Sequence, residues 1–455
     1  MEDNINTSII DYSLFDKYSQ DYFLSNLILP LYEDEKYLKL AICKESNLNS
    51  IEQKFSRKLK FKEIFLNEMK FLLSNIDLKK ELFKLLSKTN ENINSVNQTK
   101  VFVEKLIFYS ITNRASDIHI ESSNKRILFR FRIDGFLKTF FVLDSTYSKQ
   151  ISSYIKLIAN LDITQNRLPQ DSRFKLNLNA KEYDFRVSIL PIIEGESIVI
   201  RVLDSNKKQK SLDTLGFSKH IVVSLYDALK LNQGLILVAG PTGSGKTTTI
   251  YSLLKDLNSD KKKIITVEDP VEYKMHNIQQ IAVDNKIGLT FSSVLKNILR
   301  QDPDVLLIGE IREEESLNIA LQASLTGHLV ISTIHSNSAL ETLSRLIDLN
   351  ADEFLLATSL KYILSQRLVL SYCKSCEGKG CKECNFTGYF DRLSLGEIIK
   401  VDEHISSMIL KKESLNEIKK YLLLNDYQDI FNDGLSKIKN KLTSKEEVYK
   451  VINNE

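Results

Sequence analysis

Apolar residues recur with two different periods along this chain, and the change of period marks its organisation. Before residue 98, the apolar positions of Ile64–Leu73 and Leu78–Leu86 follow helical spacing, which predicts short amphipathic helices. Ser87–Gln98 is polar and is expected to be a linker. A predicted helix at Val101–Thr112 then leads into segments whose apolar residues alternate with a period of two, the spacing of β-strands.

Arginines occupy polar positions in three of these alternating segments. Residues 127–133, 183–189 and 198–202 each place apolar side chains on one face of a strand and polar side chains on the other. The arginines of the polar face are Arg130, Arg132, Arg186 and Arg201. The pattern predicts a half-buried sheet in an α+β domain, and taken alone it favours a solvated arginine face.

The polar stretch Asp204–Lys210 separates this domain from a second pattern, in which short apolar strands alternate with helical segments. That order predicts a parallel, doubly wound α/β sheet. We expect its strands at Leu235–Ala239, Ile264–Val267, Val305–Ile308 and Leu329–Thr333.

The loop after the first of these strands matches the phosphate-binding pattern G-x-x-x-x-G-K-[ST] completely, and a helical segment follows it. Glycines in such a loop let backbone N–H groups point at phosphate oxygens, and the helix N-terminus adds its positive dipole end. Lys246 is expected to reach the β- and γ-phosphates of ATP, and the Thr247 hydroxyl to ligate Mg²⁺. The expected nucleotide contacts are Gly240, Pro241, Thr242, Gly243, Ser244, Gly245, Lys246, Thr247 and Thr248.

Two acidic segments follow other strands of the same predicted sheet. Asp304–Glu310 is an apolar strand that ends in an acid, the layout of a Walker B element, so Glu310 is a candidate ligand of Mg²⁺. Glu268–Glu272 closes the strand at Ile264–Val267. Because the carboxyl ends of parallel strands form the ligand crevice of such sheets, both acids can converge on the phosphate loop. Either acid could instead be a helix cap or a surface charge.

Four of the five cysteines lie close together in a paired C-x-x-C pattern: Cys373, Cys376, Cys381 and Cys384. This spacing suits a tetrahedral zinc site in which four thiolates leave no open position, so the zinc would be structural. Disulfides are the alternative, disfavoured in the reducing compartment expected of an ATP-binding chain. A redox role lacks the surrounding βαβ pattern. The remaining Cys43 is expected to be a buried apolar residue.

Composition and charge narrow the function classes. Lys and Arg total 62 against 59 Asp and Glu, a net charge of +3 that gives no reason to expect a nucleic-acid partner. No apolar run approaches the roughly 18 to 20 residues that span a bilayer. The first residues lack the basic start and apolar stretch of a signal peptide. We therefore expect a cytoplasmic protein of two or three domains.

From Arg114 to Glu397 the chain resembles the secretion and type IV pilus assembly ATPases of the type II secretion superfamily. The matching stretches are Ala115–Glu121, Pro169–Asp171, the phosphate loop, Glu268–Tyr273, Leu299–Asp304, Gly309–Arg312, Leu325–Leu329, Ser332–Ser336 and Gln366–Leu368. The resemblance implies a RecA-like P-loop NTPase domain, preceded by a PAS-like α+β domain and carrying a small zinc-binding insertion and a helical C-terminal tail. Departures from the family pattern occur at Ser172, Lys296 and Leu370.

The resemblance also implies roles for single residues. Glu272 corresponds to the general base or water-positioning residue and Glu310 to the Walker B acid, with Asp269 near the nucleotide. His328 and His335 correspond to a histidine motif that senses the γ-phosphate.

The same family works as a hexameric ring in which the α+β domain lends arginines to a neighbouring subunit's nucleotide. Arg186 and Arg201 fall on those positions, which reverses the preference for a solvated face. Arg300 and Arg312 match further arginines near the phosphates or the subunit interface.

The implied domains are a variable, mostly helical docking region at 1–97, the α+β domain at 98–205, a linker at 206–215, the ATPase domain at 216–370, the tetracysteine module at 371–392 and a helical region at 393–455.

The expected function is a homohexameric cytoplasmic ATPase that powers assembly of a type IV pilus or a type II secretion pseudopilus, for protein secretion or DNA uptake. Its N-terminal region would dock on inner-membrane platform or anchoring proteins. Three alternatives remain: a retraction ATPase, a zinc-ribbon nucleic-acid-binding regulator that uses ATP as a ligand, and an ATP-binding protein that does not hydrolyse ATP. Retraction ATPases as a group lack the tetracysteine insertion.

Overall fold

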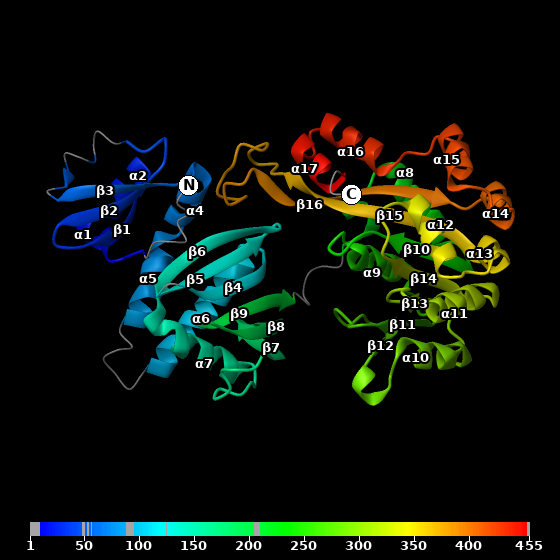
Figure 1. Ribbon diagram of the computed structural model, residues 1–455, viewed down its shortest axis with the longest axis horizontal. Coiled ribbons are helices and arrows are strands. Elements are labelled where there is room, and N and C mark those ends of the chain that lie inside the picture. Colours follow the sequence, from blue (N-terminus) through cyan, green and yellow to red (C-terminus); the bar gives the residue numbers. More distant parts are fainter. Residues whose placement is uncertain are drawn as a thin grey trace. The chain divides into compact units, whose positions relative to one another are not determined.

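A computed structural model describes residues 10–47, 51, 54–55, 57–87, 95–123, 125–203 and 210–452. The chain divides into two compact units (Figure 1). Unit 1 comprises Met1–Asn206 together with Cys373–Phe390, and unit 2 comprises Lys207–Tyr372 together with Asp391–Glu455. Most of the linker expected at 87–98, and the first part of the one expected at 206–215, lie outside the described residues.

The N-terminal part of unit 1 combines short helices with a small sheet of order β1-β2-β3. The helices predicted at 64–73 and 78–86 are confirmed as α4 and α5, and Cys43 is buried as expected. The sheet was not predicted, because β3 presents lysines at alternate positions and only one residue of it is buried. The elements are α1 (Leu14–Tyr18), α2 (Gln20–Asn26), β1 (Leu29–Glu33), β2 (Tyr37–Ile42), β3 (Lys58–Glu63), α4 (Leu66–Leu73) and α5 (Ile76–Ser87).

Residues 95–203 of unit 1 form the predicted α+β domain. Its antiparallel sheet has the order β6-β5-β4-β9-β8-β7, and α6 and α7 cover one face of it (Figure 1). Helix α6 begins at Ser95, so the last four residues of the expected linker are helical. The elements are α6 (Ser95–Thr112), β4 (Ala115–Ser123), β5 (Arg126–Ile133), β6 (Phe136–Asp144), α7 (Ser148–Ile158), β7 (Gln170–Leu178), β8 (Lys181–Ile192) and β9 (Gly195–Leu203).

Unit 2 is built on the predicted α/β sheet, with the order β12-β11-β13-β14-β10-β15-β16. Neighbouring strands from β12 to β15 pair in parallel. All four predicted strands are confirmed, as β10, β11, β13 and β14. The strands are β10 (Gly234–Ala239), β11 (Ile264–Glu268), β12 (Ile278–Ala282), β13 (Val305–Ile308), β14 (Leu329–Ile334), β15 (Leu360–Tyr372) and β16 (Tyr389–Lys400).

Both faces of this sheet are buried under helices, which explains why its strands are continuously apolar. Alternate residues of β10 show the division: Leu235 and Leu237 pack with α10 to α14, whereas Ile236 and Val238 pack with α8 and α9. The helices are α8 (Lys219–Ala228), α9 (Lys246–Leu257), α10 (Phe291–Ile298), α11 (Glu314–Leu325), α12 (Ala339–Asp348), α13 (Glu353–Ser359) and α14 (Glu403–Leu410).

The C-terminal region begins as a strand rather than as a helix, which corrects the boundary expected at residue 393. Strand β16 runs to Lys400, and helices follow it. Glu397 on β16 is buried and accepts the N–H of Ala339 at 2.6 Å and of Ile430 at 3.0 Å, so one carboxylate joins the starts of α12 and α16. The last helices are α15 (Leu415–Leu424), α16 (Ile430–Lys439) and α17 (Lys445–Ile452).

Among the described residues, no helix combines the length and the apolar character needed to cross a membrane.

Candidate nucleotide and metal sites

The phosphate loop joins β10, in the middle of the sheet, to the start of α9. Gly240, Gly243 and Gly245 have φ values of +148°, +80° and +92°, a region that residues with side chains rarely adopt. A Cβ atom on Gly240 would lie 2.7 Å from the Gln366 carbonyl oxygen. The Lys246 ammonium donates to the carbonyls of Gly240 at 2.6 Å and Pro241 at 3.0 Å. The loop therefore curls around its own lysine, with Thr247 and Thr248 exposed at the helix start.

Gln366 on β15 holds this loop through its side-chain amide, a role that sequence analysis did not assign. Its side-chain amide donates to the Ser244 carbonyl at 2.7 Å and accepts the Thr249 hydroxyl at 2.8 Å. Gln366 is fully buried. One side chain thus connects the loop backbone to the helix that carries the lysine.

Glu310 and His335 reach the same edge from the ends of β13 and β14. The Glu310 carboxylate pairs with Arg312 and lies 3.7 Å from the His335 Nε2 atom. Burial lowers the pKa of Lys246 to about 8, against the opposing charge of Glu310. Burial also lowers the pKa of His335, as do the charges of Lys246 and Arg312, while Glu310 raises it. These side chains therefore form one electrostatic group beside the phosphate loop.

Asp269 and Glu272 follow β11 and are exposed. The pKa of Arg312 is raised chiefly by its hydrogen bond to Glu310, and the charge of Asp269 adds to the effect, which places Asp269 close to this group. The Glu272 backbone N–H donates to the Tyr251 hydroxyl of α9 at 3.2 Å. The acids expected to converge on the phosphate loop thus follow adjacent strands, β11 and β13, at their carboxyl ends.

Two predicted site residues lie at the opposite edge of this sheet. His328 precedes β14, and its Nδ1 atom contacts the Ala323 carbonyl at 3.0 Å and the Thr326 hydroxyl at 3.1 Å. The length of β14, about 20 Å for six residues, separates it from His335. Within one chain the two histidines therefore lie at opposite ends of β14, and a role of His328 at the nucleotide stays a prediction. Arg300 is exposed on a turn whose neighbour Gln301 contacts Lys263, just before β11, so it too lies where strands begin.

The arginines of unit 1 form a row across the sheet. Strand register places Arg173, Arg186, Arg201, Asp117 and Arg132 opposite one another on β7, β8, β9, β4 and β5. Arg201 donates to Asp117 at 2.8 Å, yet its side chain is 62% exposed. Sequence analysis missed Arg173, because only the pairing of β7 with β8 reveals that it lies beside Arg186.

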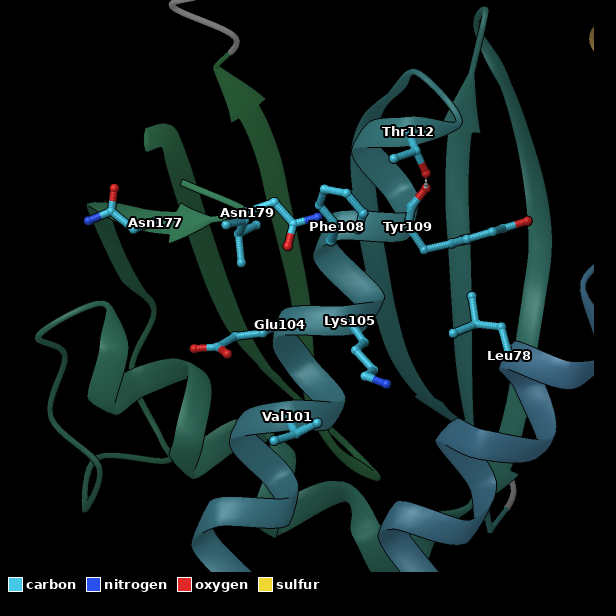
Figure 2. A pocket seen from close by; sticks show the side chains of 10 residues that line it. Leu78, Val101, Glu104, Lys105, Phe108, Tyr109, Thr112, Asn177 and Asn179 are labelled. Carbon is cyan, nitrogen blue, oxygen red and sulfur yellow. Dashed lines mark hydrogen bonds between the residues drawn. The ribbon is translucent and has the colours of Figure 1, made fainter. Parts of the chain in front are cut away.

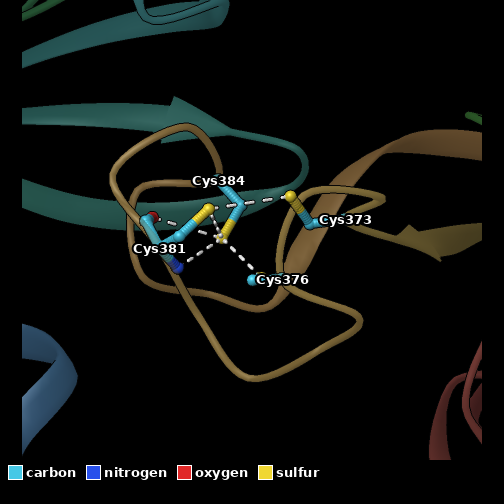
Figure 3. Close-up of side chains that lie close together, drawn as sticks. All are labelled: Cys373, Cys376, Cys381 and Cys384. Atoms are coloured by element: carbon cyan, nitrogen blue, oxygen red, sulfur yellow. Dashed lines mark hydrogen bonds between the residues drawn. The ribbon is translucent and has the colours of Figure 1, made fainter.

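The four clustered cysteines have the geometry of a tetrahedral metal site. All are free thiols whose sulfur atoms lie within 4.8 Å of one another (Figure 3). The pairs Cys373–Cys381, Cys376–Cys384 and Cys381–Cys384 are each 3.8 Å apart. Four sulfurs held about 2.3 Å from zinc in a tetrahedron lie about 3.8 Å apart, so these distances fit zinc closely.

Backbone groups complete the cysteine loop. The N–H groups of Cys381 and Gly388 donate to the Cys384 sulfur at 3.1 and 3.3 Å, and that of Gly380 donates to Cys376 at 3.2 Å. Burial raises the pKa of Cys384. The N–H groups of Cys381 and Gly388, together with the neighbouring thiols, outweigh this effect and lower the pKa to about 7. The loop thus favours a thiolate, the form that binds metal, at Cys384, whereas burial raises the pKa of Cys373 to about 11 and also raises that of Cys376.

The comparisons with known proteins show the family of the chain. Residues 94–450 match the model of a family described as type II/IV secretion system protein. The chain belongs to this family. It is 42% identical over 377 residues to type II secretion system protein E of Dickeya dadantii, covering 78% of this chain and 75% of that one. It is 38% identical over 374 residues to the type II secretion system ATPase E of Vibrio cholerae, covering 77% and 74%.

Solved structures with a similar fold include a pilus retraction motor and another bacterial ATPase. The pilus retraction motor PilT with bound ADP has a TM-score of 0.57 and 26% identity, covering 77% of this chain and 96% of that one. The Legionella pneumophila ATPase DotB has a TM-score of 0.63 and 22% identity, covering 78% and 96%. The chain is therefore a secretion or pilus-assembly ATPase, and it couples ATP hydrolysis to that work.

A pocket of about 500 Å³ lies elsewhere in this secretion ATPase, in unit 1. Glu104, Lys105, Phe108 and Tyr109 of α6 face it, with Asn177 and Asn179 from the end of β7 and the turn after it (Figure 2). None of the predicted site residues lines this pocket.

Proposed function

We propose that this secretion ATPase is the motor that drives assembly of a type II secretion pseudopilus or a type IV pilus. The observation that carries the proposal is the group formed by Lys246, Glu310 and His335 at one sheet edge, in a chain 42% identical to a type II secretion system protein E. The tetracysteine module and the higher identity to protein E support assembly over retraction.

The site residues divide the work of hydrolysis. Lys246 and the loop N–H groups would bind the β- and γ-phosphates, and Glu272 would orient the attacking water. Thr247 and Glu310 are the oxygen donors that would hold Mg²⁺, which neutralises charge on the phosphates. Glu310 would then exchange its ion pair with Arg312 for the metal.

The cysteine cluster is proposed to hold one structural zinc ion. The sulfur spacing and the backbone N–H donors support this assignment. With four thiolates as ligands, the ion would stabilise the loop between β15 and β16 and take no part in hydrolysis.

The working form is proposed to be a homohexamer at the cytoplasmic face of the inner membrane, held there by partner proteins that bind the N-terminal region. In the ring, Arg186 and Arg201 of one subunit would contact the nucleotide of the next. The exposed side chain of Arg201, and the half-buried Arg186 opposite it on β8, support this role.

The proposal is tested by replacing the two carboxylates separately. Glu310→Gln and Glu272→Gln should each bind ATP with nearly unchanged affinity and lose almost all turnover, because the phosphate loop stays intact. Nucleotide binding by fluorescence and phosphate release measure the two properties independently. Glu417→Gln, on the exposed surface of α15, is the control and should retain turnover. Turnover at the wild-type level in both test variants would contradict the assigned roles.

A further inference from the structure

Tyr251 connects the helix after the phosphate loop to the segment that carries Glu272. It lies on α9, five residues after Lys246, and its side chain is buried. Its hydroxyl donates to the Glu268 carboxylate and accepts the Glu272 backbone N–H at 3.2 Å. The contacts join two elements, α9 and the end of β11, that each present a candidate site residue.

Glu268 is a firm anchor for this hydroxyl. The residue is 5% exposed, and its other carboxylate oxygen accepts the Thr266 hydroxyl at 2.6 Å and the Gln280 amide at 3.2 Å. A buried carboxylate with this many donors has little freedom to move, since any shift leaves a charged oxygen without its partners. Burial, and then the hydrogen bond and charge of Glu268, raise the pKa of Tyr251, so its hydroxyl stays protonated and keeps donating.

The segment from 268 to 273 is held at both ends around Tyr251. The Tyr273 ring meets the Tyr251 ring edge to face, with centroids 4.5 Å apart and planes at 80°. Gln280 also donates to the Tyr273 carbonyl at 3.1 Å, so one amide contacts both ends of the segment. Glu272 lies between these ends with an exposed side chain, and its main chain is held by the Tyr251 hydroxyl.

We propose that Tyr251 is a positioning residue for ATP hydrolysis, holding the main chain of Glu272 at a fixed place relative to the helix that begins at Lys246. The inference rests on the proposed role of Glu272 as the residue that orients water. An orienting carboxylate must be placed to better than about 1 Å, because a misplacement of about 1 Å can cost about 10²-fold in rate. ATP affinity depends on the phosphate loop, which the hydroxyl does not touch.

Tyr251→Phe separates this role from packing, because it removes the hydroxyl and keeps the ring. We expect kcat to fall by about tenfold while the ATP dissociation constant stays within about twofold. Tyr362→Phe is the matched control. Tyr362 is 4% exposed on β15 and belongs to the same core, so its variant should keep the wild-type kcat. Equal losses of kcat in both variants would indicate general loosening and overturn the proposal.

A double-mutant cycle tests whether Tyr251 and Glu268 act as one unit. Glu268→Gln keeps the shape of the side chain but removes the negative charge of the group that accepts the hydrogen bond from the Tyr251 hydroxyl. We expect it to lower kcat much as Tyr251→Phe does, and the double variant to be no slower than the slower single variant, within about twofold. Losses that multiply would show that the two residues act separately, which contradicts the proposal.

Glu272→Gln distinguishes failure of the positioning role from failure of the proposed catalytic role. If Glu272→Gln retains turnover, the role of Glu272 is wrong and the positioning role falls with it. If Glu272→Gln abolishes turnover while Tyr251→Phe keeps the wild-type kcat, only the positioning role is overturned.

Discussion

At the scale of single residues, the phosphate loop holds a cation in surroundings that disfavour its charge. Lys246 donates to two carbonyls of its own loop, yet burial lowers its pKa from 10.5 to about 8. At neutral pH the ammonium is still charged in the folded protein, and its burial lowers the free energy of unfolding. Such a cost is expected for a cation whose charge the ATP phosphates would neutralise.

Lys246→Met should raise the melting temperature of the nucleotide-free protein at pH 7 and remove ATP binding. The gain should shrink as pH rises from about 8 to about 10.5, because the folded wild-type protein releases this proton first and its own stability rises with pH over that window. Thermal unfolding of both proteins across this pH range measures the gap. A gap that widens with pH would contradict the pKa assignment.

Gln366 should affect ATP binding although it is fully buried, because it holds the phosphate loop in place. Gln366→Met removes the donor to Ser244 and the acceptor for Thr249, so we expect the ATP dissociation constant to rise by about tenfold, the cost of two buried hydrogen bonds. Gln322→Met on the exposed face of α11 is the matched control. Unchanged affinity in the Gln366 variant would show that the loop keeps its shape without this support.

At the scale of elements, the cysteine loop belongs with the sheet of unit 1 although the strands beside it lie in the sheet of unit 2. Lys138 of β6 donates to the Asn385 carbonyl at 2.8 Å, and the Arg114 guanidinium lies 3.5 Å from the centre of the Phe390 ring. Burial lowers the pKa of Lys138 to about 8, while the charge of Cys384 raises it. The loop is thus held in unit 1 by contacts of residues that follow Cys384.

Cys376→Ser should abolish stoichiometric zinc binding, and a chelator should do the same to the wild-type protein. The loop would lose on the order of 10 kcal/mol of metal-coupled folding energy, so cleavage within residues 373–388 should accelerate in limited proteolysis. Cys43→Ser, buried outside the cluster, should keep one zinc per chain. Equal zinc content in all three samples would contradict the assignment.

Whether a strand could be predicted from the sequence depends on how many of its side chains are buried. The strands at 235–239 and 305–308 were predicted because both of their faces are covered, which makes them continuously apolar. Strands β12 and β15 were missed, since β12 has no fully buried residue and β15 interrupts its apolar run with Gln366 and Arg367.

The candidate site follows the same logic. The phosphate loop and cysteines have local spacing that sequence alone reveals, whereas the arginine row requires strand register. His328 precedes its strand and His335 follows it, so the predicted strand at 329–333 already carried a signal that the two lie at opposite edges. Motif resemblance grouped them because it does not record which edge a residue occupies.

At the scale of the whole molecule, the proposed ring makes a prediction about mixtures of subunits. Arg186→Ala and Lys246→Ala should each be inactive as homogeneous rings. Mixed together they should recover part of the turnover, because an intact phosphate loop from one variant can meet an intact arginine from the other. An arginine finger contributes about 10³-fold or more, so the recovered rate stands well above either parent. Subunit-mixing assays with phosphate detection measure this, and no recovery would place the arginine within its own subunit's site or outside any site.

The measurement that tests the account most directly is magnesium-dependent phosphate release by the purified full-length protein, compared with Lys246→Ala. The account predicts steady release from ATP that stops when Mg²⁺ is chelated and falls to background in the variant. Rings of the wild-type protein that release no phosphate, or a Lys246→Ala variant as active as the wild type, would contradict it.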